Sequence, residues 1–205
     1  MWAIVINDEI TKIIVNPARL TIDDVKYSPK IFSLWTVEEK EAKGIYEIVH
    51  DNSNRKDEQW YINTNVSYDF DGSEVTSSYG TATPKEHEDI TWTQADIDDL
   101  DEDEGLEVGD LKTRGLKYNL IKDLKLTVAN ELAKTDWYIT RKTEKSTAIP
   151  SAISTHRNSV RTKQATMETQ ITNASNTPAL ETLYKYTITD GVQSRPLGEL
   201  PTLEI

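Results

Sequence analysis

Cysteine is absent from this sequence of 205 residues, which excludes disulfides, thiolate zinc sites, iron–sulfur clusters and a cysteine nucleophile. Long apolar runs are absent as well, because no stretch reaches the roughly 18 consecutive apolar residues that a membrane-spanning helix needs. The apolar residues at the start follow no basic segment and end within six positions, so the pattern of a signal peptide is missing. We therefore expect no membrane partner and synthesis without export.

Sequence motifs of catalysis are also missing. The chain has only 8 glycines, and it contains neither a Gly-x-Ser-x-Gly elbow nor a glycine-rich phosphate loop. Its three histidines, His50, His87 and His156, have no second histidine at metal-binding spacing. A Ser/His/Asp triad stays open, because its members need not be adjacent in sequence. We expect a protein that is not an enzyme and that has no cofactor and no bound metal.

Charge is distributed unevenly along the chain, whose formal net charge is −12. Residues 1–95 have a net charge of −8, residues 96–110 have nine acids and no base, and residues 111–205 have a net charge of +5. Such asymmetry suggests regions with different roles. The overall excess of acid disfavours broad nucleic-acid binding, because affinity for phosphate depends on lysine and arginine.

The first 95 residues predict a β-rich region. β-branched runs at 3–6 and 11–15 flank Asn7-Asp8-Glu9, which favours a hairpin. Thr36-Val37-Glu38-Glu39 is a capping box and predicts one short helix over about 37–43, with Gly44 at its C-terminal end. Further short strands are expected at 20–22, 25–27, 45–49, 60–62, 66–70 and 74–79.

The rest of the chain changes to helical periodicity. Leucine and valine recur every fourth residue from Leu116 to Leu132, which predicts one long amphipathic helix from about 110 to 143. A second helix begins near Pro150 and carries heptad spacing with the polar residues Arg157 and Gln164 in the seam. Thr177-Pro178 begins a third, short helix, and the sequence after Asp190 is expected to be extended coil.

These patterns together predict an α+β fold: a β-rich N-terminal half with one short helix, then an antiparallel α-helical hairpin and an extended C-terminal tail. We place the parts at 1–95 (β-rich domain), 96–110 (acidic linker), 111–189 (helical hairpin domain) and 190–205 (tail). The polar seam residues disfavour a strong stand-alone coiled coil.

Two charged segments have alternative interpretations. The acids from Asp99 to Asp110 resemble a calcium loop, but Gly105 falls one residue too late for the required turn. The preferred interpretation is a solvated linker, or a set of acids that complements the N-terminal end of the helix expected to begin near residue 110. A basic set in the back half could bind nucleic acid, but a solvated face, or a face that docks on the acidic linker, is favoured. The basic residues are Arg141, Lys142, Lys145, Arg157, Arg161 and Lys163.

Two stretches carry a resemblance to a known family. The first runs from Tyr27-Ser28-Pro29-Lys30 through Trp35-Thr36-Val37-Glu38-Glu39 to Gly44-Ile45-Tyr46. The second joins a leucine-rich helix to Thr135-Asp136-Trp137, Arg141, Glu144 and Ile149-Pro150, and then to the helix His156-Arg157-Asn158-Ser159-Val160-Arg161. This combination resembles small tail proteins of tailed bacteriophages, of the fibre-assembly or tail-accessory type.

The resemblance implies a non-enzymatic virion structural protein that belongs to or is attached to the phage tail, at the fibre, baseplate or adaptor region. Its expected partners are other phage tail proteins and further copies of itself, with a trimer suited to a tail appendage. The expected location is the virion tail, after synthesis in the host cytoplasm. Two alternatives stay open: a tail-fibre assembly chaperone that is absent from the mature particle, and a glycan-binding module that uses the aromatic residues of the β-rich half.

The family resemblance assigns no catalytic residue, and the residues we single out have structural or interaction roles. Trp137 and Arg141 lie one helical turn apart, as do Arg157 and Arg161 on the second helix. A helical hairpin brings these two segments together. We expect Trp137 to pack under the turn and Arg141 or Arg157 to pair with Asp136 or Glu144.

Overall fold

A computed structural model describes residues 1–100 and 105–203 of the chain. The chain divides into two compact units, Met1–Thr83 and Pro84–Ile205. The architecture is α+β, with strands predominating in the first unit and helices in the second, as the sequence predicts. No helix in the described ranges is long and apolar enough to cross a membrane.

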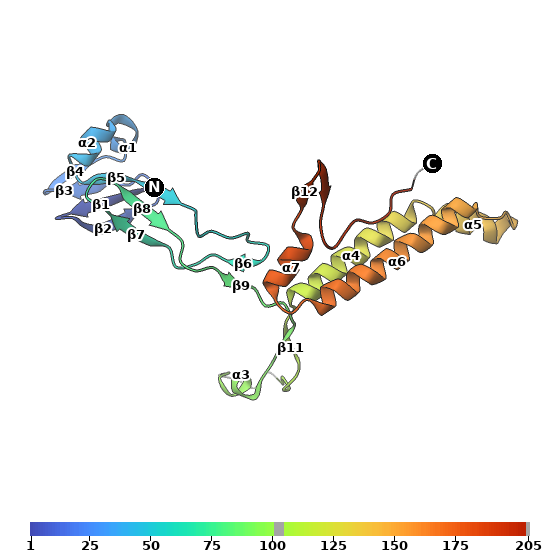
Figure 1. Ribbon diagram of the computed structural model, residues 1–205. Helices are drawn as coiled ribbons and strands as arrows, with labels where there is room; N and C mark the ends of the chain where they lie inside the picture. The colour runs from blue at the N-terminus through green and yellow to red at the C-terminus, as the bar shows by residue number, and fades with distance from the viewer. Residues whose placement is uncertain (101–104, 204–205) are drawn as a thin grey trace. The chain divides into compact units, whose positions relative to one another are not determined.

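The first unit is built on a five-stranded sheet with the strand order β2-β1-β5-β8-β7 (Figure 1). All neighbouring strands are antiparallel except β5 and β8, which are parallel. The predicted first hairpin is confirmed, and its turn places Asn7 and Asp8 at φ angles of 54° and 64°, as a tight hairpin turn requires. The strands are β1 (Trp2–Ile6), β2 (Glu9–Ile14), β5 (Ile45–Asp51), β7 (Ser67–Phe70) and β8 (Val75–Ser78).

Both faces of this sheet are covered by apolar side chains. Because side chains alternate along a strand, Ile4 packs into one cluster while Ala3 and Val5 pack into the other. The first cluster is closed by Ile31 and Phe32. The two sets of buried core residues are Ile4, Ile14, Leu20, Ile31, Phe32 and Ile45, and Ala3, Val5, Ile48 and Val75.

Two short helices precede β5, where the sequence predicted one. The apolar segment after Pro29 forms α1 (Ile31–Leu34), which buries Ile31 and Phe32 against the sheet. The predicted capping box begins α2 (Val37–Glu41): the Thr36 hydroxyl accepts from the Glu39 amide at 3.2 Å, and the Thr36 amide donates to Glu39 Oε2 at 2.8 Å. Gly44 follows with a φ of 71°, and a Cβ there would collide with the Val5 carbonyl.

Among β1–β9, four short strands lie outside the main sheet. A small hairpin joins β3 (Leu20–Ile22) to β4 (Val25–Tyr27), as predicted. The strands β6 (Tyr61–Ile62) and β9 (Thr83–Pro84) form another pair.

The second unit begins with a small excursion before the long helices. The strands β10 (Ile90–Thr91) and β11 (Leu111–Thr113) pair with each other. Between them, Thr93 and Asp96 form a second capping box at the start of α3 (Gln94–Asp98). Asp96 also pairs with Lys112, which ties α3 to β11. Part of the segment predicted to be an acidic linker therefore has regular structure.

The predicted long helix is interrupted, so the expectation of one helix from 110 to 143 is wrong. It consists of α4 (Leu116–Ala133) and α5 (Asp136–Lys145). The start is later because Gly115 is the N-cap and its amide donates to Asp89 Oδ1 at 2.8 Å. The break lies at Thr135, whose backbone leaves the helical region (φ −118°, ψ 6°) and whose hydroxyl donates to the Leu132 carbonyl at 3.0 Å.

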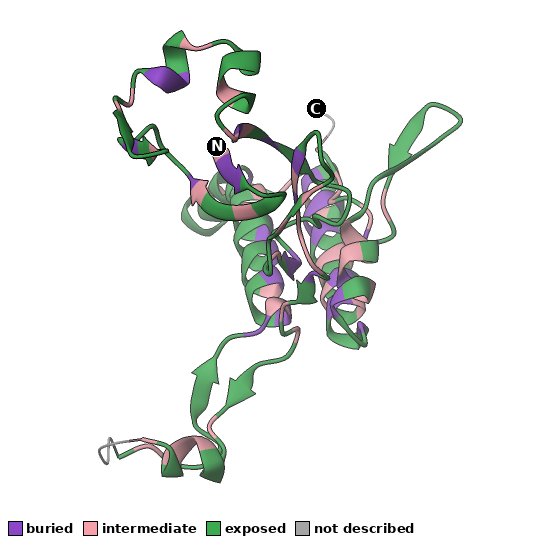
Figure 2. Cartoon of the chain, turned by 90° about the vertical axis from the view of Figure 1, so that its left-hand side faces the viewer, coloured by how far each residue is buried: buried purple, intermediate pink, exposed green. Residues whose placement is uncertain are grey.

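The helix α6 (Ser151–Asn173) packs along α4 in the opposite direction (Figure 1). Contacts show the direction, because Glu131 near the end of α4 meets His156, while Lys125 meets Glu168 further along α6. Most of the predicted apolar positions are buried, as the buried segments along both helices show (Figure 2), whereas Leu116 and Leu132 at the ends of the ridge are half-buried. The buried apolar positions are Leu120, Leu124 and Val128 on α4, and Ile153, Val160, Met167 and Ile171 on α6.

The last part of the chain is more ordered than the expected extended coil. After α7 (Thr177–Tyr184), the strands β12 (Thr187–Thr189) and β13 (Val192–Ser194) form a hairpin around Asp190 and Gly191, both of which have positive φ. Leu197 is 1% exposed, and its carbonyl accepts from Lys163 Nζ at 2.9 Å. Its apolar side chain gains from burial, which explains why the segment folds back onto the helices.

The core of the first unit provides a direct test of this fold. Ile45 is completely buried, so Ile45→Ala should lower the free energy of unfolding of this unit by about 2–5 kcal/mol. Val49 lies on the same strand with 47% of its surface exposed, and Val49→Ala is the matched control with an expected change below about 1 kcal/mol. Chemical denaturation followed by tryptophan fluorescence measures both. Equal losses for the two variants would contradict the described packing.

Candidate interaction site

Arg157 anchors the junction between α4 and α5 to α6. Its side chain is buried, and Nη1 lies 2.7 Å from the Leu132 carbonyl, 2.7 Å from Thr135 Oγ1 and 2.8 Å from Asp136 Oδ1. The predicted pairing of Arg157 with Asp136 is therefore confirmed. The guanidinium adds a side-chain donor to the Leu132 carbonyl, which also accepts from the Thr135 amide at 3.1 Å, and it holds Asp136 at the start of α5.

A second polar contact supports the same junction and was not anticipated from the sequence. Glu131 lies 3.4 Å from His156 Nε2 and also pairs with Lys134. The hydrogen bond from Lys134 is the largest cause of a lowered pKa of the Glu131 carboxyl, and His156 contributes less. A carboxyl with a lowered pKa stabilises the folded state above its ordinary pKa, and this contribution is lost as the pH falls. The i, i+3 spacing of Glu131 and Lys134 was the signal available in the sequence.

Trp137 does not pack under the turn, so that expectation is wrong. The space under the junction is filled by Thr135, which is 1% exposed, and by Arg157. Trp137 instead lies on the outside of α5 with 51% of its surface exposed. Because the chain leaves helical geometry at Thr135, α5 does not continue the buried face of α4.

Three side chains of α5 form a stack at the surface. The ring centroids of Trp137 and Tyr138 are 3.8 Å apart. The guanidinium carbon of Arg141 lies 4.8 Å from the Trp137 centroid and 5.4 Å from the Tyr138 centroid. This is the geometry of a cation–π interaction, and it holds the arginine in place without neutralising its charge.

Arg141 shows no ion pair within the part of the chain that the structure describes, and neither do Lys142 and Lys145. Of the two acids predicted as partners, Asp136 pairs with Arg157, and Glu144 forms no ion pair with another described residue, so the predicted alternative pairings of Arg141 do not form there. We refer to Trp137, Tyr138, Arg141, Lys142 and Lys145 as the α5 surface. It combines an exposed aromatic ring with positive charge, a combination that is enriched at protein–protein interfaces.

Arg161 is the last of the residues singled out from the sequence. It is exposed on α6, one turn after Arg157, and it has no ion pair with another described residue. The structure therefore separates the two arginines: Arg157 is buried at the junction, and Arg161 faces outward.

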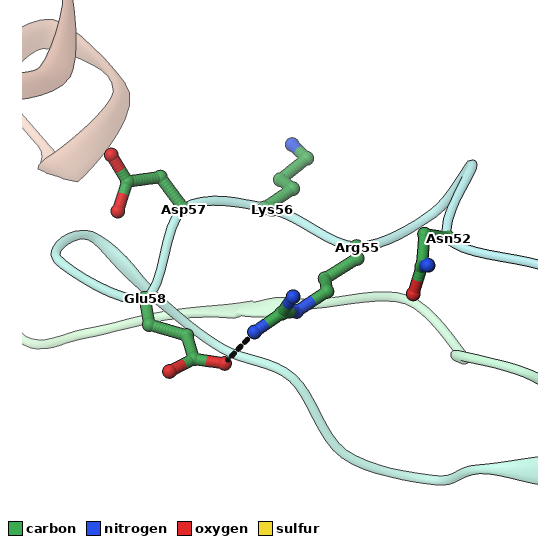
Figure 3. A pocket seen from close by; sticks show the side chains of 5 residues that line it. All are labelled: Asn52, Arg55, Lys56, Asp57 and Glu58. Carbon is green, nitrogen blue, oxygen red and sulfur yellow. Dashed lines mark hydrogen bonds and ion pairs between the residues drawn. The ribbon is translucent and has the colours of Figure 1, made fainter. Parts of the chain in front are cut away.

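The loop before β6 lines a shallow cavity of about 470 Å³ in the first unit (Figure 3). Arg55 donates to Glu58 at 2.7 Å across it. The walls are polar and open, whereas small-molecule sites are concave and predominantly apolar. The lining residues are Asn52, Arg55, Lys56, Asp57 and Glu58.

A Ser/His pair exists in the first unit but lacks the rest of a catalytic arrangement. His50 Nδ1 lies 2.6 Å from Ser77 Oγ, and the two residues are direct neighbours across the parallel strands β5 and β8. Nucleophilic catalysis also needs a group that orients the histidine. Within the described ranges, no carboxylate is hydrogen-bonded to His50. We interpret the pair as a cross-strand hydrogen bond.

Among residues 1–100 and 105–203, no three His, Asp or Glu side chains lie close enough together to hold a metal ion. The candidate calcium loop from Asp99 to Asp110 includes residues 101–104, which lie outside the described residues.

Comparisons with protein-family models, with curated proteins and with solved structures return no match for this chain.

Truncation of Arg157 tests the junction. Arg157→Ala removes the donor that the Thr135 hydroxyl and the Asp136 carboxylate share, while the Leu132 carbonyl keeps its bond from the Thr135 amide, so we expect a loss of about 1–3 kcal/mol in the free energy of unfolding of the helical unit. Arg161→Ala removes the same charge from an exposed position on the same helix and should change stability by less than about 0.5 kcal/mol. Thermal unfolding followed by circular dichroism compares them, and equal stability of the two variants would refute the anchoring role.

In contrast to Arg157, we expect truncation of Trp137 to have little effect on the free energy of unfolding. Half of its surface is in water, so Trp137→Ala should lower stability by less than about 1 kcal/mol. Leu124→Ala, at a buried position on α4, should cost about 2–5 kcal/mol in the same assay. A loss at Trp137 as large as that at Leu124 would mean that the indole belongs to the core.

Proposed function

We propose that this chain is a non-enzymatic structural protein of a tailed bacteriophage, held in or on the virion tail by docking to other proteins. The observation that carries the proposal is the α5 surface, where an exposed indole and an unpaired arginine lie on a helix fixed by Arg157. A rigid aromatic and cationic surface of this kind suits recognition of another protein, because little conformational entropy is lost when it binds.

The family resemblance supports the same function. Its second stretch, 132–144 with 149–150 and 156–161, contains Asp136, Trp137, Arg141 and Arg157. The residues that suggested a phage tail protein are therefore the residues that build the junction and the α5 surface. We propose other tail proteins and further copies of this chain as the partners, with a trimer as the assembly that suits a tail appendage.

A tail-fibre assembly chaperone is the main alternative. It would use the same surface transiently and would be absent from the finished particle.

A glycan-binding module is less well supported, because the tryptophans of the β-rich unit are not free platforms for sugar stacking. Trp60 is 3% exposed, and Trp2 and Trp35 pack against the core. Nucleic acid is a weak candidate partner because the net charge of −12 opposes phosphate.

Mass spectrometry of purified phage particles tests the proposed function. We expect the chain at a fixed ratio to the major tail proteins in washed particles. If the chain is abundant in infected cells but absent from the particles, the result contradicts a virion protein and favours the assembly chaperone. A mixture of full and empty particles separated by density provides the control for loosely bound protein.

A further inference from the structure

The α5 surface contains positive charge that the described part of its own chain leaves unpaired. Arg141, Lys142 and Lys145 have no carboxylate partner there, and Trp137 and Ile139 are 51% and 39% exposed. A complementary surface must supply carboxylates for the cations and an apolar group for the indole. An exposed charge gains from such a partner mainly by electrostatic steering and specificity, while the indole supplies contact area.

The same chain carries a surface of this kind around β11. Asp98, Asp99, Glu107 and Asp110 are exposed, and Val108, which follows Glu107 in the chain, is 59% exposed. None of these four carboxylates forms an ion pair within the described ranges. We refer to these five residues as the acidic surface.

The backbone on both sides of Val108 is held in place. The Gly109 amide donates to the Trp92 carbonyl at 2.9 Å, and the Trp92 amide donates to the Asp110 carbonyl at 2.8 Å. Asp110 Oδ2 also accepts from the Glu107 amide at 3.0 Å. The backbone from Glu107 to Asp110 is therefore held before a partner arrives, which lowers the entropic cost of binding.

We infer that the α5 surface docks onto the acidic surface of a second copy of this chain. The inference deepens the proposed function, on which it rests for the role of the α5 surface. The match is both electrostatic and apolar: Arg141 and the two lysines face carboxylates, and Trp137 meets Val108. Because the two surfaces differ, the contact is head to tail, and it closes into a ring if the rotation between copies allows it.

Sedimentation velocity of the full chain tests the inference. At low ionic strength the average sedimentation coefficient should rise with protein concentration, and high salt should reverse the rise because it screens the charges. Arg141→Gln should weaken self-association by about tenfold or more. Arg161→Gln is the matched control, with the same charge change at an exposed position, and should associate like the unaltered chain. Circular dichroism checks that both variants fold.

Variants in which charges are reversed on one surface at a time test whether the α5 surface pairs with the acidic surface. Asp99 and Glu107 suit this charge reversal because no described hydrogen bond uses their side chains. Arg141→Glu alone and the double variant Asp99→Lys/Glu107→Lys alone should each stay monomeric, because the two surfaces of each variant then carry less complementary charge. In an equimolar mixture, the unaltered α5 surface of the double variant meets the unaltered acidic surface of Arg141→Glu. The two variants should therefore associate with each other.

Three outcomes overturn the inference: a chain that stays monomeric at every concentration and ionic strength, equal association of Arg141→Gln and Arg161→Gln, or a mixture of the two charge-reversed variants that fails to associate. None of them contradicts membership of the virion, which the particle analysis decides separately. Conversely, self-association of a chain that is absent from particles would keep this inference and reject the proposed function.

Discussion

The helical unit depends on one buried guanidinium. Arg157 of α6 lies within hydrogen-bonding distance of three oxygens at the junction of α4 and α5: one backbone carbonyl, one hydroxyl and one carboxylate. A helix that ends leaves carbonyls without partners, and burial of such a group is costly. With Arg157 in place the chain can break at Thr135 while α4 and α6 stay packed. The break in turn leaves Trp137 half exposed, with Arg141 stacked beside it.

Local signals in the sequence predicted the local structure well. The capping box at Thr36 and the hairpin turn at Asn7 and Asp8 both depend on neighbouring residues, so the sequence contains the whole cause. The same holds for the apolar ridge of α4 and α6, because burial follows the helical period. The pairing of Arg157 with Asp136 was predicted as one of several options, since the hairpin brings both residues to the same end.

Features that depend on distant residues were missed or misplaced. The break at Thr135 removes a predicted continuous helix, and the guanidinium that donates to Thr135 there lies 22 residues later in the chain. Leu197 is buried where its carbonyl meets Lys163, which no local pattern reveals. The exposure of Trp137 has the same origin, since a single apolar residue does not indicate which face of a new helix is buried. The Asp190-Gly191 turn, by contrast, was a local signal that could have predicted the last hairpin.

The proposed function requires the α5 surface to be a docking surface rather than a solvated helix face. Hydrogen exchange of the full chain tests this requirement most directly, by comparison of the dilute chain with the assembled state at equal pH and temperature. We expect slower exchange in α5 (Asp136–Lys145) and around Glu107–Asp110 on assembly, with the outer face of α6 around Arg161 unchanged. Unchanged exchange in α5, with protection confined to other elements, would contradict it.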